Sequence, residues 1–123
     1  MVGVLLIGAG GFAGAIARYV VDVGVTQRFA SFPWGTLVVN VTGCFVLGLV
    51  FALLTQRFDP DPTVRMAITV GFIGAYTTFS TFAFETMRLA EDGAILIAVS
   101  NVGLSVVVGI IAVSLGTWLG RAL

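Results

Sequence analysis

Four long apolar runs without a charged side chain, separated by short connectors, constrain the fold of this chain more than any other feature. A helix needs about 20 mainly apolar residues to cross a bilayer, whereas the strands of a membrane barrel are about half as long. The runs therefore predict an all-α integral membrane protein with four transmembrane helices in one membrane domain. The expected helices cover approximately residues 2–24, 33–55, 63–89 and 94–120.

The composition agrees with lipid as the solvent for most of the surface. Hydrophobic residues make up 59% of the chain and charged residues only 10%, against about 25% charged residues in soluble domains. The net charge is zero, which offers no basic field for nucleic acid. The chain has no histidine and no visible nucleophile–base pair, so we do not expect an enzyme.

The arginines do not select one orientation in the membrane. Orientation usually follows an excess of Lys and Arg in the short loops on one side. With four spans, three arginines lie on each side: Arg57, Arg65 and Arg121 on one, and Arg18, Arg28 and Arg88 on the other. Either the count is too small to be informative, or the chain inserts in both orientations and pairs with itself as an antiparallel dimer.

Small residues mark the faces on which the helices are expected to pack closely. Gly10 and Gly14 have GxxxG spacing in the first stretch, and Gly116 and Gly120 repeat it in the fourth. In lipid such faces let helix backbones approach each other. The pattern predicts close packing and says little about function.

The third stretch contains a segment that is unusual for the middle of a transmembrane helix. Residues 71–82 read GFIGAYTTFSTF, two glycines followed by clustered hydroxyl residues. Glycine and β-branched threonine weaken a helix, so we expect a break near residues 74–78. Backbone groups freed by such breaks often form ion sites in membrane transport proteins. The alternative is an unbroken helix whose hydroxyls bond to carbonyls one turn earlier.

Side chains after the expected break fall on two faces. At about 100° per residue, Phe79 and Phe82 share one face. The hydroxyl residues Thr77, Ser80 and Thr81 lie on the other. The alternative for the two phenylalanines is ordinary contact with lipid or with a packed core.

Further polar side chains lie within the apolar stretches. Asn40 is in the middle of the second, one turn after Thr36. Asn101 and Ser105 are one turn apart in the fourth. Polar groups in a bilayer are costly without partners, so these residues either line a pathway or form hydrogen bonds between helices. Glu85 is expected at the water edge, as an exposed carboxylate with no special role.

Together these groups suit a pathway for a small anion. The central stretch offers hydroxyl and amide donors and the electropositive edges of phenylalanine rings. It holds no fixed charge, whereas a proton-coupled exporter normally needs a titratable group and a cation pathway prefers carboxylates or carbonyls. The residues therefore indicate an anion pathway without naming the anion.

Three stretches resemble the small fluoride channel family, Fluc or CrcB. They are residues 11–19 (GFAGAIARY), 35–43 (GTLVVNVTG) and 71–82, in order along the first three expected helices. The resemblance implies an antiparallel, dual-topology homodimer in the cell inner membrane, with two fluoride pores and a central structural sodium ion. The implied role is passive fluoride export, which lowers fluoride toxicity in the cytoplasm.

The same resemblance implies roles for individual residues. Main-chain carbonyls of Gly74 and Thr77 from both subunits would hold the sodium ion, and Arg18 would attract anions at a vestibule. Gly109 stands where a further hydroxyl is expected, so the chain departs from the family pattern there. The implied fluoride pathway comprises Phe79, Phe82, Asn40, Ser80, Thr81, Ser105 and Thr36.

The main alternative is a dual-topology multidrug exporter, which also has four small helices. That family needs an acidic residue deep in its first helix, and the nearest acid here, Asp22, lies close to the end of the span. A non-transporting membrane subunit of a larger complex is a further alternative, which the cluster of pore-type residues disfavours.

Overall fold

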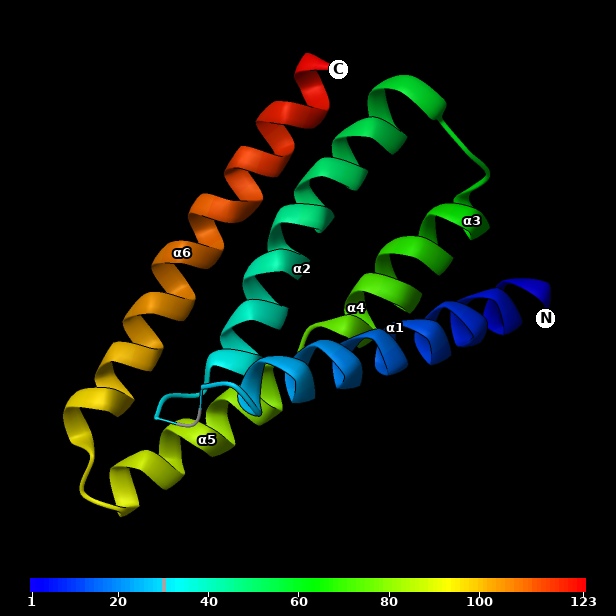
Figure 1. Cartoon of the computed structure of the whole chain (residues 1–123). Helices are drawn as coiled ribbons and strands as arrows, with labels where there is room; N and C mark the ends of the chain where they lie inside the picture. The colour runs from blue at the N-terminus through cyan, green and yellow to red at the C-terminus, as the bar shows by residue number, and fades with distance from the viewer. Residues whose placement is uncertain (30) are drawn as a thin grey trace.

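The computed structural model describes residues 1–29 and 31–123, and this part of the chain is helical apart from short connections (Figure 1). Four segments are long and apolar enough to cross a membrane: Val2–Thr26, Trp34–Phe58, Pro62–Glu91 and Ile95–Ala122. They confirm the predicted all-α membrane protein with four membrane-length helices. The elements are α1 (Val2–Thr26), α2 (Trp34–Leu53), η1 (Leu54–Phe58), α3 (Pro62–Met66), η2 (Ala67–Ile73), α4 (Gly74–Tyr76), α5 (Phe79–Glu91) and α6 (Ile95–Ala122), where η marks a π-helical segment.

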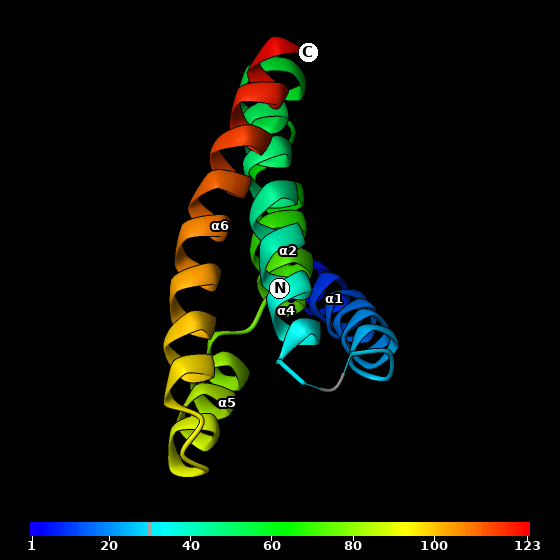
Figure 2. The same ribbon diagram turned by 60° about the vertical axis from the view of Figure 1, so that its left-hand side comes forward.

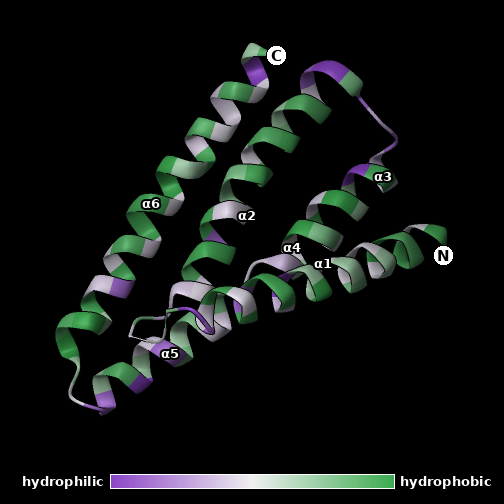
Figure 3. Cartoon of the chain, in the orientation of Figure 1, coloured by the Kyte–Doolittle hydropathy of each residue, from purple (hydrophilic) through white to green (hydrophobic). Residues whose placement is uncertain are grey.

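Apolar side chains cover the outside of the molecule. Figure 3 shows apolar residues along the lengths of the helices and polar residues concentrated at the α2–α3 connection and near the end of α5. Such an exterior is favourable in lipid and unfavourable in water. The buried hydrophobic residues of the described part are few and mostly of moderate size: Leu37, Val39, Ala52, Ile73, Ala98 and Ala112.

α2 and α6 run side by side along their lengths (Figures 1 and 2). Their backbones meet at glycines: a Cβ on Gly116 would collide with the Phe45 carbonyl oxygen, and one on Gly48 with the Val113 carbonyl oxygen. Gly120 approaches α2 in the same way. The small-residue face predicted for the fourth stretch is therefore its contact face with α2, where close approach increases dispersion contacts.

α1 crosses the first half of the third span obliquely and packs on η2 and α4 (Figure 2). A Cβ on Gly10 would collide with the Ala67 carbonyl oxygen, and one on Gly14 with the Phe72 carbonyl oxygen. This confirms the second predicted glycine face. α5 packs mainly against α6 instead, so the two halves of the third span have different neighbours.

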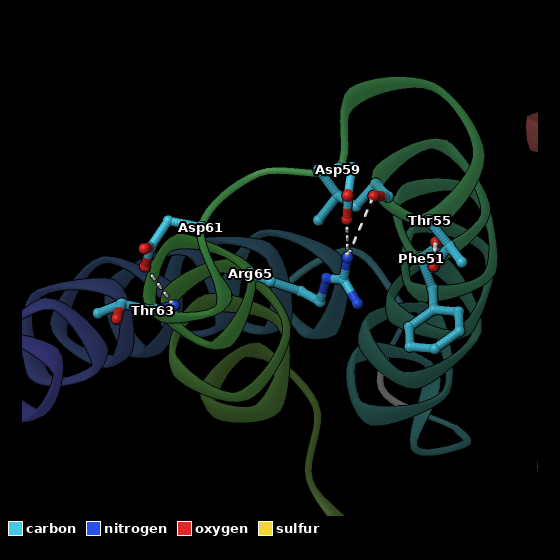
Figure 4. A network of polar contacts seen from close by, with 7 residues as sticks. Phe51, Thr55, Asp59, Asp61, Thr63 and Arg65 are labelled. Atoms are coloured by element: carbon cyan, nitrogen blue, oxygen red, sulfur yellow. Dashed lines mark hydrogen bonds and ion pairs between the residues drawn. The ribbon is translucent and has the colours of Figure 1, made fainter.

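The connection between α2 and α3 is tied by polar contacts (Figure 4). Arg65 Nη2 donates to Asp59 Oδ1 at 3.0 Å and to the Leu54 carbonyl at 3.4 Å. Asp61 Oδ1 accepts from the Thr63 N–H at 2.8 Å and so caps α3. This hydrogen bond holds the pKa of the Asp61 carboxyl below its ordinary value, because it favours the charged form.

α5 ends in a tight turn at Gly93. The Gly93 φ is +79°, a left-handed conformation that glycine adopts without strain. The Ala94 N–H donates to the Leu89 carbonyl at 2.8 Å, and the Gly93 N–H donates to the Ala90 carbonyl at 3.1 Å. This pair is the Schellman pattern, and it turns the chain back so that α6 packs along α5.

Candidate functional site

Two extended residues lie between α4 and α5. Thr77 has φ −83° and ψ 160°, and Thr78 has φ −149° and ψ 119°. α4 ends at Tyr76 and α5 begins at Phe79. This α4–α5 junction lies inside the third membrane-length segment, where free backbone groups must find partners other than bulk water.

The side-chain amide of Asn40, on α2, pairs with both backbone groups of Thr78. Asn40 Oδ1 accepts from the Thr78 N–H at 2.8 Å, and Asn40 Nδ2 donates to the Thr78 carbonyl at 2.9 Å. An amide has two N–H donors, so one donor remains for another partner. Asn40 therefore forms a hydrogen bond between helices, which is one of its two predicted roles. It also keeps one N–H donor, which the other predicted role, lining a pathway, requires.

Thr78 also caps α5, although the predicted site residues do not include it. Thr78 Oγ1 accepts from the Thr81 N–H at 3.2 Å and donates to Thr81 Oγ1 at 3.0 Å. A threonine directly before a helix commonly accepts from the third helical N–H. The sequence signal for Thr78 is that a threonine directly before a helix is a favourable N-cap residue.

Gly43 brings the backbone of α2 close to the same junction. A Cβ on Gly43 would collide with Cγ2 of Thr77. A hollow of about 230 Å³ lies beside this contact, and its lining includes Asn40, Gly43, Thr78 and Phe79. Two positions on α2 therefore contact the junction: Gly43 through its backbone and Asn40, one turn earlier, through its amide.

Phe79 and Phe82 lie on the same side of α5. Their ring centroids are 5.7 Å apart and the ring planes are tilted by 49°. Phe79 is 79% exposed, and Phe82 is half-buried. The rings share a face, as the helical spacing predicts.

The hydroxyl residues around the junction do not act as one set. Ser80 is exposed and Thr81 is half-buried on α5. Thr77 Oγ1 instead donates to the Ile73 carbonyl at 3.2 Å, one turn earlier. The prediction that Thr77 shares a helical face with Ser80 and Thr81 is wrong, because Thr77 precedes α5 and its hydroxyl bonds back to Ile73, the last residue of η2.

Thr36 and Ser105 carry buried hydroxyls that have no hydrogen-bond partner within residues 1–29 and 31–123. The same is true of Glu85 Oε2. The prediction of Glu85 as an exposed carboxylate is therefore wrong, because packing of α5 against neighbouring helices leaves this residue half-buried. The Thr36 hydroxyl lies beside the Glu85 carboxylate. Unpaired buried polar atoms cost about 1–3 kcal/mol each, so a polar partner at Ser105 would be favourable.

Asn101 links α6 to α5. It is 1% exposed, and its Nδ2 donates to Thr86 Oγ1 at 2.9 Å. Thr86 Oγ1 donates in turn to the Phe82 carbonyl at 2.7 Å. Asn101 therefore forms an interhelical hydrogen bond, one of its two predicted roles, and the chain of bonds ends at the backbone of Phe82.

The other predicted site residues lie at separate places. Gly74 is exposed at the start of α4, three residues before Thr77, and Arg18 is half-buried on α1. Gly109 is buried against α2, where an added Cβ would lie 3.6 Å from Cys44 Sγ. The position where a further hydroxyl was expected is therefore a helix contact.

Four membrane-length helices that bring an amide, hydroxyls and an aromatic pair to one junction define a small multi-pass membrane protein of the channel and transporter class. The chain belongs to the CrcB family: the family described as CrcB-like protein, Camphor Resistance (CrcB), matches residues 5–117. This confirms the resemblance that the three sequence stretches indicate.

Relatives match almost the full length of the chain. The Fluoride-specific ion channel FluC of Acidobacterium capsulatum is 48% identical over 118 residues, covering 95% of this chain and 94% of the relative. The protein of that name from Solibacter usitatus is also 48% identical, covering 95% and 97%. The one from Hydrogenovibrio crunogenus is 44% identical, covering 95% and 89%.

Proposed function

We propose that this chain forms a fluoride-selective ion channel, which exports fluoride passively across the cell inner membrane and lowers fluoride toxicity in the cytoplasm. Relatives at 44% and 48% identity carry the name of a fluoride-specific ion channel. The observation that carries the proposal is the orientation of the Asn40 amide. Its oxygen accepts from the Thr78 N–H, so the group left to meet an ion is an N–H donor. A donor without a fixed charge suits a small anion that exchanges its water for hydrogen bonds.

The proposed pathway continues from Asn40 along α5 and α6. The paired rings can present electropositive edges to an anion. The unpaired buried hydroxyls of Thr36 and Ser105 can donate to it. Arg18 would attract anions at a vestibule. The pathway side chains are Phe79, Phe82, Asn40, Ser80, Thr81, Ser105 and Thr36.

The proposed working unit is an antiparallel, dual-topology homodimer with two pores and a structural sodium ion at its centre. In it the run from α3 through η2 to α4 and the helix α5 act as the two halves of one broken span. The sodium ligands would be the main-chain carbonyls of Gly74 and Thr77 from both subunits. The residues fit this role, because carbonyls in the last turn of a helix lack helical donors and carbonyl oxygens suit a hard cation. The exposed position of Gly74 supports contact with a second copy.

The multidrug-exporter alternative finds no support at its key residue. Asp22 accepts a hydrogen bond from Thr26 Oγ1 at 3.2 Å, near the end of α1. An acid that binds and releases protons at mid-membrane would have to lie deeper in the helix.

Ion efflux from liposomes tests the proposal. Purified protein is reconstituted into vesicles loaded with potassium fluoride or potassium chloride, and efflux is followed with ion-selective electrodes after a potassium ionophore is added. We expect rapid fluoride efflux and little chloride efflux. Equal rates for the two anions would contradict fluoride selectivity.

A further inference from the structure

Helix geometry identifies two carbonyls that lose their usual donors at the α4–α5 junction. In an α-helix the N–H of residue i donates to the carbonyl of residue i−4. The Gly74 carbonyl would then accept from Thr78, and the Thr77 carbonyl from Thr81. Neither N–H is free, because the Thr78 N–H donates to Asn40 Oδ1 at 2.8 Å and the Thr81 N–H donates to Thr78 Oγ1 at 3.2 Å.

We infer that Asn40 and Thr78 are positioning residues for the cation site, because their side-chain oxygens hold the two N–H groups that would otherwise bond to the Gly74 and Thr77 carbonyls. The inference rests on the proposed sodium site and goes beyond it, since it names the groups that hold the usual helical donors of both carbonyls. Asn40 then serves two sites at once. Its oxygen keeps a cation ligand free, and its remaining N–H serves the anion pathway.

The same contacts explain why these two side chains are needed. Backbone N–H groups in a membrane must be paired. Without an acceptor at Asn40 Oδ1 or Thr78 Oγ1, the freed N–H would pair best by continuing the helix, and this would occupy the carbonyl. The close approach of α2 at Gly43 places Asn40 within reach of Thr78. The availability of the two carbonyls thus depends on α2 as well as on the third span.

The test measures sodium-dependent stability and fluoride flux on the same purified preparations. Thermal unfolding is followed as sodium chloride replaces N-methylglucamine chloride at constant ionic strength, because an ion that binds only the folded state raises the unfolding temperature. Asn40→Leu and Thr78→Val remove the two acceptors, whereas Asn40→Asp and Thr78→Ser keep them. Thr69→Val is the matched control, since Thr69 Oγ1 bonds within its own helix to the Arg65 carbonyl at 2.9 Å.

We expect half-maximal stabilisation by sodium to require about 10- to 100-fold more sodium in Asn40→Leu and Thr78→Val. Thr78→Ser and Thr69→Val should respond to sodium near the wild-type concentration. Asn40→Asp keeps the acceptor and adds a negative charge near the cation, so it should need no more sodium than the wild type, although it should lose fluoride flux. Wild-type sodium responses in both acceptor-deleted variants, with fluoride flux intact in the wild-type protein, would overturn the inference and leave the channel function standing. A wild-type protein that conducts fluoride without responding to sodium would also overturn it. Absence of fluoride flux from the wild-type protein would overturn the proposed function itself.

Discussion

The α2–α6 contact and the α4–α5 junction are held together by opposite means. Along α2 and α6 the backbones meet directly, because Gly48 and Gly116 leave no side chain between them. At the junction the backbone leaves helical form, and the side chains of Asn40 and Thr78 take over its hydrogen bonds. The α2–α6 contact thus depends on the absence of side chains, whereas the α4–α5 junction depends on side chains that pair with the backbone.

The difference shows how a small chain divides its tasks in lipid. Close glycine packing needs no polar group and forms a rigid frame. The junction needs polar partners for its backbone, which Asn40 on α2 and Thr78 supply. Substitutions in the frame should therefore change stability, and substitutions at the junction should change transport.

Asn40→Asp is expected to have the largest effect. A negative charge close to a passing anion adds a barrier of about 4 kcal/mol. Fluoride flux should therefore fall more than about 100-fold. The protein should remain folded, because the carboxylate still accepts from the Thr78 N–H, although the bond from Asn40 Nδ2 to the Thr78 carbonyl is lost. Liposome flux together with size-exclusion profiles measures both. Wild-type flux in this variant would remove Asn40 from the pathway.

Phe82→Ile should lower fluoride flux by about fivefold, because the variant loses a polarised ring edge worth about 1 kcal/mol. The unfolding temperature should change little. Phe84→Ile is the matched control on the same helix, since the Phe84 ring is exposed and takes no part in the ring pair. Equal flux in Phe82→Ile and the control would contradict a role for the ring.

Gly116→Ala tests the frame. The added Cβ would collide with the Phe45 carbonyl oxygen, so we expect a loss of about 1–3 kcal/mol in the free energy of unfolding. Reconstituted protein that remains folded should conduct fluoride normally. Gly103→Ala, on the same helix with nothing within 4 Å of the added Cβ, should not lower the free energy of unfolding, because alanine is a better helix former than glycine. Similar losses in both variants would contradict the α2–α6 contact as the cause, because alanine is the better helix former at both positions.

Thr86→Val should have a smaller effect, because it removes one interhelical hydrogen bond worth about 0.6 kcal/mol. Asn101→Leu removes the other partner, so the double variant should lose less stability than the sum of the single variants. Ser114→Ala is the control, since Ser114 Oγ bonds within its own helix to the Ile110 carbonyl at 2.8 Å. Strict additivity of the two single effects would contradict the link from α6 to α5.

Asp61→Ala should have the smallest effect, because this fully exposed cap lies outside both regions. The pKa of Asp61 is lower in the folded protein, so its stabilising contribution is complete above the ordinary value of 3.8 and is lost as pH falls through the lowered folded value. The unfolding temperatures of wild type and variant should therefore differ slightly at neutral pH and converge in acid. A constant difference at all pH values would show that the carboxylate charge is not involved.

Much of the fold could be predicted from local patterns. The four membrane-length helices follow from run length, and the glycine faces on α1 and α6 follow from GxxxG spacing. The shared face of Phe79 and Phe82 follows from helical spacing. The π-helical segments η1 and η2 were not predicted, because their hydrogen-bond register leaves no residue pattern that run length reveals.

The site was less predictable because its residues act through partners on other helices. Thr78 was missed, since its importance depends on Asn40, which is 38 positions away in the chain. Glu85 was misjudged because its burial depends on the packing of neighbouring helices against α5. Thr77 was placed on the wrong face, because helical spacing was extended to a residue that precedes α5.

Run length and composition are enough to make this chain a four-helix membrane protein, because the cost of placing charges and unpaired backbone in lipid is a local property of each stretch. Only the three-dimensional arrangement decides which polar groups meet. The pairing of Asn40 with Thr78 and the link from Asn101 to Phe82 join residues that no sequence periodicity relates. Hydrogen bonds need atoms within about 3 Å and correctly oriented, and helix packing supplies that geometry.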